Sequence, residues 1–254
     1  MIIDTHCHLD DESFEADLTA VLERAKDANI EKIIIPGASI KDLPKAVRIS
    51  EEQKNIFFAV GVHPYHVDEM DESVLRKFAK HEKCVAVGEC GLDYYRLPES
   101  GTNEYKARQK EVFIAQIKLA CELKKPLIVH IRDANEDSLS ILKEYEDKLV
   151  GGVLHCYNAS PILLELSRTF YYGIGGVLTF KNEKKLGAIL PQIPKERLLI
   201  ETDAPYLTPT PYRGERNEPA RTIFVRDKMS EILNLSGDEI ERITTQNALK
   251  LFAI

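Results

Sequence analysis

Eight short runs of apolar residues, rich in Val and Ile, recur along this chain and alternate with longer stretches of helical character. The runs are hydrophobic almost throughout rather than at every second position, which is typical of parallel strands covered on both faces. Alternation of strand and helix builds a parallel sheet through crossover connections, and eight repeats favour closure into an α/β fold, the (β/α)8 TIM-like barrel. The predicted strands are residues 2–6, 32–36, 56–60, 85–89, 127–131, 152–155, 171–175 and 198–203.

The stretches between the apolar runs have the periodicity of amphipathic helices. The clearest spans residues 104–123, where Phe113, Ile117 and Ala120 recur on one face at spacings of four and three. Ser236 followed by Glu239 forms a capping signature, which predicts a helix that begins there. Residues 204–219 hold four prolines and are predicted to form a long, stiff loop. The other predicted helices are residues 11–28, 43–52, 72–81, 136–147, 161–168, 183–190, 220–233 and 238–252.

Length and composition fit a single globular domain over residues 1–254. No low-complexity linker divides the chain, and 44% hydrophobic with 30% charged residues is ordinary for a soluble domain. Charges interrupt every apolar run well short of the roughly 18 residues that a membrane span needs, so no membrane association is expected. Five cysteines without a Cys-x-x-Cys pair, and no basic leader at the start, predict reduced thiols in the cytoplasm. We infer no obligate protein partner.

Ionisable residues gather at the ends of the predicted strands, where the catalytic groups of such barrels are found. The first run ends in His6 and His8, which would face the same side of a strand at a spacing of two. A lone histidine at a strand end is more often an ordinary polar residue than a ligand, and a His-x-His pair alone is a weak signal. Convergence of several strand ends on one mouth is the stronger argument, and it predicts a metal site. The candidate ligands are His6, His8, Glu89, His130, His155 and Asp203.

Six candidate ligands are more than one tetrahedral ion requires. Four imidazoles and two carboxylates suit a cluster of two divalent ions, with Glu89 as the bridging carboxylate. Mixed nitrogen and oxygen ligands admit Zn, Mn, Co or Ni, and Mg less readily, because Mg prefers oxygen. The predicted division is His6, His8 and Asp203 for one ion, and His130 and His155 for the other.

Three further residues are candidates for roles around these ligands. His63 precedes Pro64 at a strand end and is better placed to contact substrate than metal. Asp4 lies two residues before His6 and is a candidate to orient that ligand. Asp93 either lines the pocket or caps a helix.

Seven segments of the chain, taken together, carry a family resemblance. They are DTHCHLD, GVHPY, GECGLDYYR, PLIVHIRDA, LHCY, GIGG and LLIETDAPYLTP…RGERNEP. In this order and spacing they resemble the TatD family of metal-dependent deoxyribonucleases, which belong to the amidohydrolase-like barrels. The resemblance covers nearly the whole chain and implies a TIM-like barrel, a divalent-metal site and hydrolysis of DNA, often as a 3′-to-5′ exonuclease. It places the six candidate ligands on the family's metal-ligand positions, His63 on a substrate-contacting position, and Arg213, Arg216 and Asn217 in an arginine-rich loop over the site.

The reaction expected from this resemblance is phosphodiester hydrolysis of DNA, at single strands or 3′ ends, by a hydroxide activated between two metals. Asp203 is the expected general base, and Glu89 is the second catalytic carboxylate. Arg132, Arg213 and Arg216 are candidates for phosphate contacts, because a guanidinium matches phosphate bidentately; each could equally be a solvated surface residue. A net charge of −7 argues against broad electrostatic binding to nucleic acid, but it leaves room for a local basic patch.

Two other functions stay open at this point. A related hydrolase could use the same metals on a small ester or amide, or on a D-aminoacyl-tRNA end. Many amidohydrolases place a carbamylated lysine on the fourth strand, where this chain has Glu89, and this difference favours the nuclease. A non-enzymatic accessory role in protein handling is disfavoured, because a binding module has no need of open metal positions.

Overall fold

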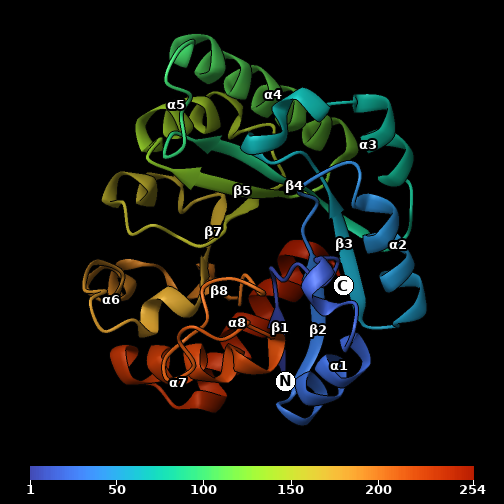
Figure 1. Ribbon diagram of the computed structural model, residues 1–254. Helices are drawn as coiled ribbons and strands as arrows, with labels where there is room; N and C mark the ends of the chain where they lie inside the picture. Colours follow the sequence, from blue (N-terminus) through green and yellow to red (C-terminus); the bar gives the residue numbers. More distant parts are fainter.

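The computed structural model describes residues 1–254 and contains one sheet of eight parallel strands in chain order, with helices around its outside (Figure 1). The backbone N–H of Thr5 donates to the carbonyl oxygen of Ile200 (3.2 Å), and Cys7 and Ala204 form a parallel bridge, so that the first and last strands meet in a nearly closed barrel. The predicted (β/α)8 architecture is confirmed. The strands are β1 (Ile2–Asp4), β2 (Ile30–Ile35), β3 (Ile56–Val60), β4 (Cys84–Asp93), β5 (Leu127–Arg132), β6 (Gly152–Leu154), β7 (Phe170–Ile174) and β8 (Leu198–Ile200).

The helices follow the predicted pattern, with shifts of one to three residues at several ends and two larger differences. The prediction for residues 11–28 is wrong at its start: a 3-10 turn over Glu12–Phe14 precedes the helix, and the Asp11 side chain caps that turn by accepting from the N–H of Ser13. Residues 161–168 form a 3-10 helix, Pro161–Leu166, instead of an α-helix. The α-helices are α1 (Leu18–Asp27), α2 (Leu43–Glu52), α3 (Glu72–Phe78), α4 (Thr102–Leu123), α5 (Asn135–Tyr145), α6 (Lys185–Ile189), α7 (Thr222–Leu233) and α8 (Gly237–Phe252). None of them is long and apolar enough to cross a membrane.

Helix α8 begins where the capping signature predicts. The Ser236 hydroxyl accepts from the backbone N–H of Glu239 (3.2 Å), which satisfies one of the free donors of the first turn. Farther along, the Asn247 side chain donates to the carbonyl oxygen of Leu198 (2.8 Å), at the start of β8. This contact places α8 at the amino ends of the strands, which leaves their carboxyl ends open.

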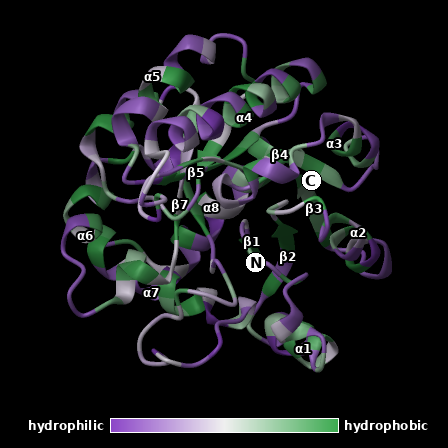
Figure 2. Ribbon diagram, turned by 45° about the horizontal axis from the view of Figure 1, so that its top comes forward, coloured by the Kyte–Doolittle hydropathy of each residue, from purple (hydrophilic) through white to green (hydrophobic).

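Apolar side chains fill both faces of the sheet, and the central strands are mostly hydrophobic in Figure 2. A larger cluster of 53 buried residues lies between strands and helices, and a smaller one of 11 takes at least one residue from every strand together with Ala248 and Phe252 of α8. Because neighbouring strand residues point to opposite faces, this smaller cluster is the barrel interior. Its members from the strands are Ile3, Ile34, Ala59, Val85, Ala86, Ile128, Val153, Tyr171 and Leu199.

Two fully buried glutamines on α4 fix the loops that carry polar residues of the barrel mouth. Gln116 accepts from the N–H of Val62 (2.7 Å) and donates to its carbonyl oxygen (3.0 Å). Gln109 makes the same pair of bonds with the backbone of Asp93, at 2.9 and 3.0 Å. Both glutamines lie on one face of α4, seven residues apart. Each one makes the two backbone hydrogen bonds that a neighbouring strand would otherwise make at that point.

We expect Gln116→Leu to lower the free energy of unfolding by about 2–4 kcal/mol, because it leaves the N–H and carbonyl of Val62 buried without partners, at about 1–3 kcal/mol each. Urea unfolding of the metal-depleted protein measures this directly. Gln246→Leu is the matched control, since Gln246 is exposed and bonds only to Arg242. Equal unfolding free energies of the two variants would contradict the role of Gln116.

Candidate metal centre

The six predicted ligands lie together at the carboxyl ends of the strands. Glu89 and His130 belong to β4 and β5, whereas the other four lie in the segments that follow β1, β6 and β8. Most are deeply buried: His6 is 0% exposed, Glu89 3% and His155 6%. The structure therefore brings together side chains that are up to 197 positions apart, from His6 to Asp203.

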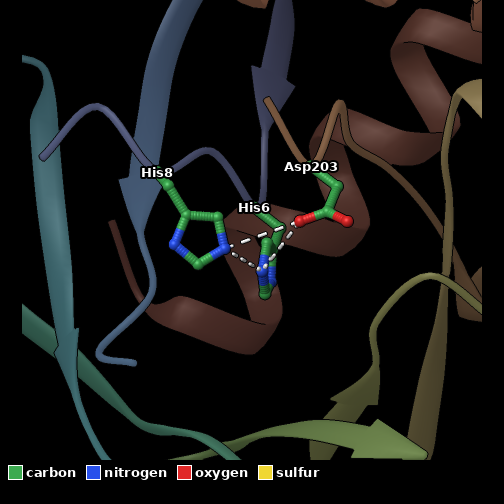
Figure 3. Close-up of side chains that lie close together, drawn as sticks. All are labelled: His6, His8 and Asp203. Carbon is green, nitrogen blue, oxygen red and sulfur yellow. Dashed lines mark hydrogen bonds and ion pairs between the residues drawn. The ribbon is translucent and has the colours of Figure 1, made fainter. Parts of the chain in front are cut away.

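The segments after β1 and β8 are joined by backbone hydrogen bonds, and this places three of the ligands. The N–H of Asp203 donates to the carbonyl oxygen of His6 (2.8 Å), and the N–H of His8 donates to that of Ala204 (2.8 Å). Asp203 has a positive φ of 56°, a conformation that Asp tolerates better than most residues. As a result the side chains of His6, His8 and Asp203 point toward one another (Figure 3). The two histidines lie outside β1, so the expected strand periodicity is not what aligns them.

The first donor group consists of His6 Nε2, His8 Nε2, Asp203 Oδ1 and Glu89 Oε2. His6 Nε2 lies 3.3 Å from His8 Nε2, 3.3 Å from Glu89 Oε2 and 3.6 Å from Asp203 Oδ1. His8 Nε2 lies 3.5 Å from Asp203 Oδ1 and 3.7 Å from Glu89 Oε2. Four ligand atoms arranged tetrahedrally at zinc-like bond lengths lie about 3.3–3.4 Å apart. The donor set and its spacing fit a divalent ion.

The second donor group consists of His130 Nδ1, His155 Nε2 and Glu89 Oε1. His130 Nδ1 lies 3.2 Å from His155 Nε2, and Glu89 Oε1 lies 2.8 and 2.9 Å from these two nitrogens. The rings of His6 and His155 stack with their centroids 3.9 Å apart, so the two groups are immediate neighbours. Glu89 therefore faces the first group with Oε2 and the second group with Oε1.

Glycines beside Glu89 allow this strand to approach its neighbour. Gly88 and Gly91 have positive φ values of 137° and 149°. A Cβ at Gly88 would overlap the carbonyl oxygen of Ile128, and one at Gly91 would overlap that of His130. The Gly-Glu-Cys-Gly sequence is therefore required for β4 to run close enough to β5 to place Glu89 against His130.

The charges of the pocket favour ionised carboxylates. Burial alone would raise the pKa of Glu89, but the nearby His155 and His6 and the hydrogen bond with His130 outweigh it and hold that pKa well below the usual range. Burial also opposes ionisation of Asp203, yet its hydrogen bond with His8 lowers its pKa. Burial works against a charge on His8 too, but the contacts with Asp203 and Glu89 prevail and raise the pKa of His8 to about 9. The pocket thus presents two anionic carboxylates to a cation.

Two buried carboxylates contact the histidines from behind, and one of them is not among the sequence candidates. Asp93 Oδ2 lies 2.8 Å from His130 Nε2, which orients that ring with Nδ1 toward Glu89. Glu201, fully buried, accepts from the N–H of Cys156 and lies 3.7 Å from His155 Nδ1. The sequence signal for Glu201 is a carboxylate directly after the apolar stretch Leu198–Ile200. A carboxylate buried at such a place needs a partner, and this could have indicated a role at the site.

Asp4 does not contact the ring of His6. Its carboxylate accepts from the N–H and hydroxyl of Thr202 at 3.0 and 2.6 Å, and from the backbone N–H of His6 at 3.3 Å. Asp4 therefore holds the end of β1 to the segment after β8 and acts on the site only through the backbone.

The predicted substrate-contacting residues differ in their exposure and in whether another residue already pairs with them. His63 faces the second group, with Nε2 3.6 Å from Glu89 Oε1. Arg132 is exposed at the end of β5 and makes no ion pair. Arg213 is exposed, donates to the carbonyl oxygen of Thr208 (2.7 Å) and stacks on Phe180. The remaining candidate, Arg216, forms a two-point ion pair with Asp17 at 2.7–2.8 Å, which occupies its guanidinium.

We expect Asp93→Asn to weaken divalent-ion binding about 10–100-fold, because His130 loses the carboxylate that fixes its ring and raises its basicity. Titration of the metal-depleted protein against a chromophoric chelator measures the affinity. Asp227→Asn, which removes an exposed carboxylate on α7, is the control. Unchanged metal affinity in the Asp93 variant would show that the contact with His130 has no such role.

The comparisons with known proteins agree on one family of metal-dependent hydrolases. The sequence model of the family described as TatD related DNase matches residues 3–253. The uncharacterized metal-dependent hydrolase YabD of Bacillus subtilis is 42% identical, with 100% of both chains covered. The protein named 3′-5′ ssDNA/RNA exonuclease TatD of Shigella flexneri is 33% identical over 100% of this chain and 99% of its own. Among solved structures, the TatD homolog YJJV of Escherichia coli has a TM-score of 0.88 at 28% identity, covering 100% of this chain and 98% of that one.

Proposed function

Since the chain belongs to the TatD related DNase family and is a metal-dependent hydrolase, we propose that it hydrolyses phosphodiester bonds of single-stranded DNA, releasing nucleotides from the 3′ end. The observation that carries this proposal is the position of Glu89, whose two oxygens each face a separate group of histidines. Paired divalent ions of this kind are widespread in enzymes that cleave phosphodiesters. A relative that shares the full length of the chain is named as a 3′-5′ exonuclease of single-stranded DNA and RNA, which supports the choice of substrate.

In this proposal the chain holds two divalent ions of the Zn, Mn, Co, Ni or Mg type. His6, His8 and Asp203 would hold one of them, His130 and His155 the other, and Glu89 both. When bound, such ions lower the pKa of a coordinated water and neutralise charge that develops on the phosphate. The second group offers only three donor atoms, which would leave room there for a substrate oxygen.

Asp203 is the general base in this proposal. Its Oδ1 faces the first donor group, whereas its Oδ2 makes no hydrogen bond with the protein, and the side chain is 14% exposed. Because the carboxylate is ionised, Oδ2 can accept a proton from a water molecule at the mouth of the pocket. Asp203 would therefore bind the cation with one oxygen and receive a proton on the other.

His63 acts on the substrate as a neutral donor. Its Nδ1 accepts from the backbone N–H of Tyr65 (3.1 Å), so its ring proton lies on Nε2, which faces Glu89. Burial lowers the pKa of His63 to about 3, which keeps the ring uncharged at neutral pH. In this proposal the Nε2–H, which lies beside the second donor group, would donate to a phosphoryl oxygen of the substrate, and the exposed Arg132 and Arg213 would contact neighbouring phosphates.

The compartment that we propose is the cytoplasm, and the proposed partner is DNA itself. All five cysteines are free in the structure, which suits a reducing environment. The negative net charge of −7 means that phosphate contacts must come from a few arginines at the mouth rather than from the whole surface.

A substrate screen under one set of divalent-ion conditions tests the proposed function. Single-stranded DNA labelled at its 5′ end, RNA, aminoacyl-tRNA and a small ester are compared, with metal-depleted protein as the blank. We expect the labelled DNA to shorten progressively from its 3′ end, only when divalent ions are present. Hydrolysis of the small ester without any release of nucleotides from DNA would overturn the proposal.

A further inference from the structure

Tyr95 is unusually exposed for a residue of its size and lies beside the candidate metal centre. It is 57% exposed, the largest value among the five exposed large hydrophobic residues of the chain. Its backbone N–H donates to Asp93 Oδ1 (2.9 Å), and the other oxygen of Asp93 contacts His130. One buried carboxylate thus fixes both the position of Tyr95 and a ring of the second donor group.

The guanidinium of Arg132 lies on one face of the Tyr95 ring, with Cζ 3.6 Å from the ring centroid. Arg132 ends β5 two residues after His130, and it is paired in register with Asp93 of β4. It makes no ion pair and no side-chain hydrogen bond, although the chain as a whole is acidic. A cation without a carboxylate partner at this place remains available to a phosphate.

The exposure of Tyr95 shows that Arg132 covers only part of it. A stack on one ring face leaves the other face open, and an open aromatic face beside a free guanidinium is the combination that binds single-stranded nucleic acid. Every base offers a π-face, whereas a small alkyl phosphate ester has none. Bases within a duplex are already stacked on their neighbours and are less available to such a surface.

We propose that Tyr95 and Arg132 form a subsite for one nucleotide next to the cleaved bond, in which the base stacks on Tyr95 and its phosphate contacts Arg132. This inference rests on the proposed function and sharpens it, because it assigns the preference for a single strand to a particular ring. The contribution of such a stack corresponds to about a tenfold change in kcat/KM or in affinity.

The test combines protein variants with substrates that lack a base. Oligonucleotides carry an abasic residue at one of the last three positions from the 3′ end, and kcat/KM is compared with that of the intact strand. The parent is expected to prefer the intact strand about tenfold at one of these positions. Tyr95→Ala is expected to lose this preference, while Tyr95→Phe, which keeps the ring, retains it. Tyr212→Ala is the matched control. The guanidinium of Arg221 also lies over the ring of Tyr212, but this ring packs against Phe224.

The outcomes separate this inference from the proposed function. A Tyr95→Ala variant that still discriminates as the parent does overturns the subsite, even if DNA is hydrolysed. If the parent releases no nucleotides from DNA, the proposed function fails, and fluorescence anisotropy of the same oligonucleotides on metal-depleted protein then decides the subsite. Equal affinity of the parent for intact and abasic strands in that measurement also overturns it.

Discussion

Replacing Glu89 with Gln is expected to reduce hydrolysis more than about 100-fold. Even the loss of a residue that only hydrogen-bonds to a metal ligand lowers metal affinity or activity about 10–100-fold. The carboxylate faces His6 and His8 with one oxygen, and His130 and His155 with the other. A Gln side chain keeps the shape but has one carbonyl oxygen and an NH2 group, which cannot bind a cation. The variant is therefore expected to lose activity and to bind fewer than two equivalents of divalent ion, as measured by steady-state kinetics and by metal analysis after desalting.

The control for Glu89→Gln is Glu111→Gln, which removes an exposed carboxylate from α4 and leaves the pocket intact. Folding is monitored separately by thermal unfolding of metal-depleted protein. In that state the variant should be less stable than the parent, because the lowered pKa of Glu89 means that its charge stabilises the folded protein against the nearby histidines, but it should still unfold in one cooperative transition. A variant with parental activity and two bound equivalents would show that Glu89 does not bridge the two donor groups.

Much of the barrel could be predicted because strand positions follow from local apolar runs. Residues 56–60 match β3 at both ends, and 43–52 match α2. Strand ends were less accurate: β1 stops at Asp4 and β8 at Ile200, so His6, His8 and Asp203 follow the strands instead of ending them. Their alignment comes from backbone bonds between two distant segments, which no local pattern encodes.

The contacts behind the ligands were harder to predict, because they depend on tertiary packing. Glu201 looks like the polar end of an apolar strand, and only the fold shows that it packs against Gly173 and approaches His155. Arg216 looks like a free cation in a basic loop, yet it pairs with Asp17, 199 residues away. Sequence patterns identify residues that can bind a phosphate or a metal, but not which of them are already paired.

Asp203→Asn is expected to lower kcat by about 10²–10⁴-fold, the usual contribution of a positioned general base. The Asn side chain can place its carbonyl oxygen where Oδ1 of Asp203 lies. Its NH2 group then occupies the position of Oδ2 and cannot accept a proton. KM for single-stranded DNA should change much less than kcat, because the arginines and His63, which are proposed to contact the substrate, remain in place. Steady-state kinetics on a 5′-labelled oligonucleotide, with saturating divalent ions, separates the two parameters.

Saturating divalent ions are essential to this comparison, because Asp203 also faces His6 and His8 and its loss weakens the first donor group. If the loss of activity reflected metal affinity alone, raising the ion concentration would restore kcat in the Asp203→Asn variant. Failure to restore it, together with a full complement of bound metal, assigns the remaining loss to proton transfer. Asp227→Asn controls for the removal of one negative charge from the surface of the chain. A variant whose kcat recovers completely would limit Asp203 to binding the ion, and the general base would then have to be sought elsewhere in the pocket.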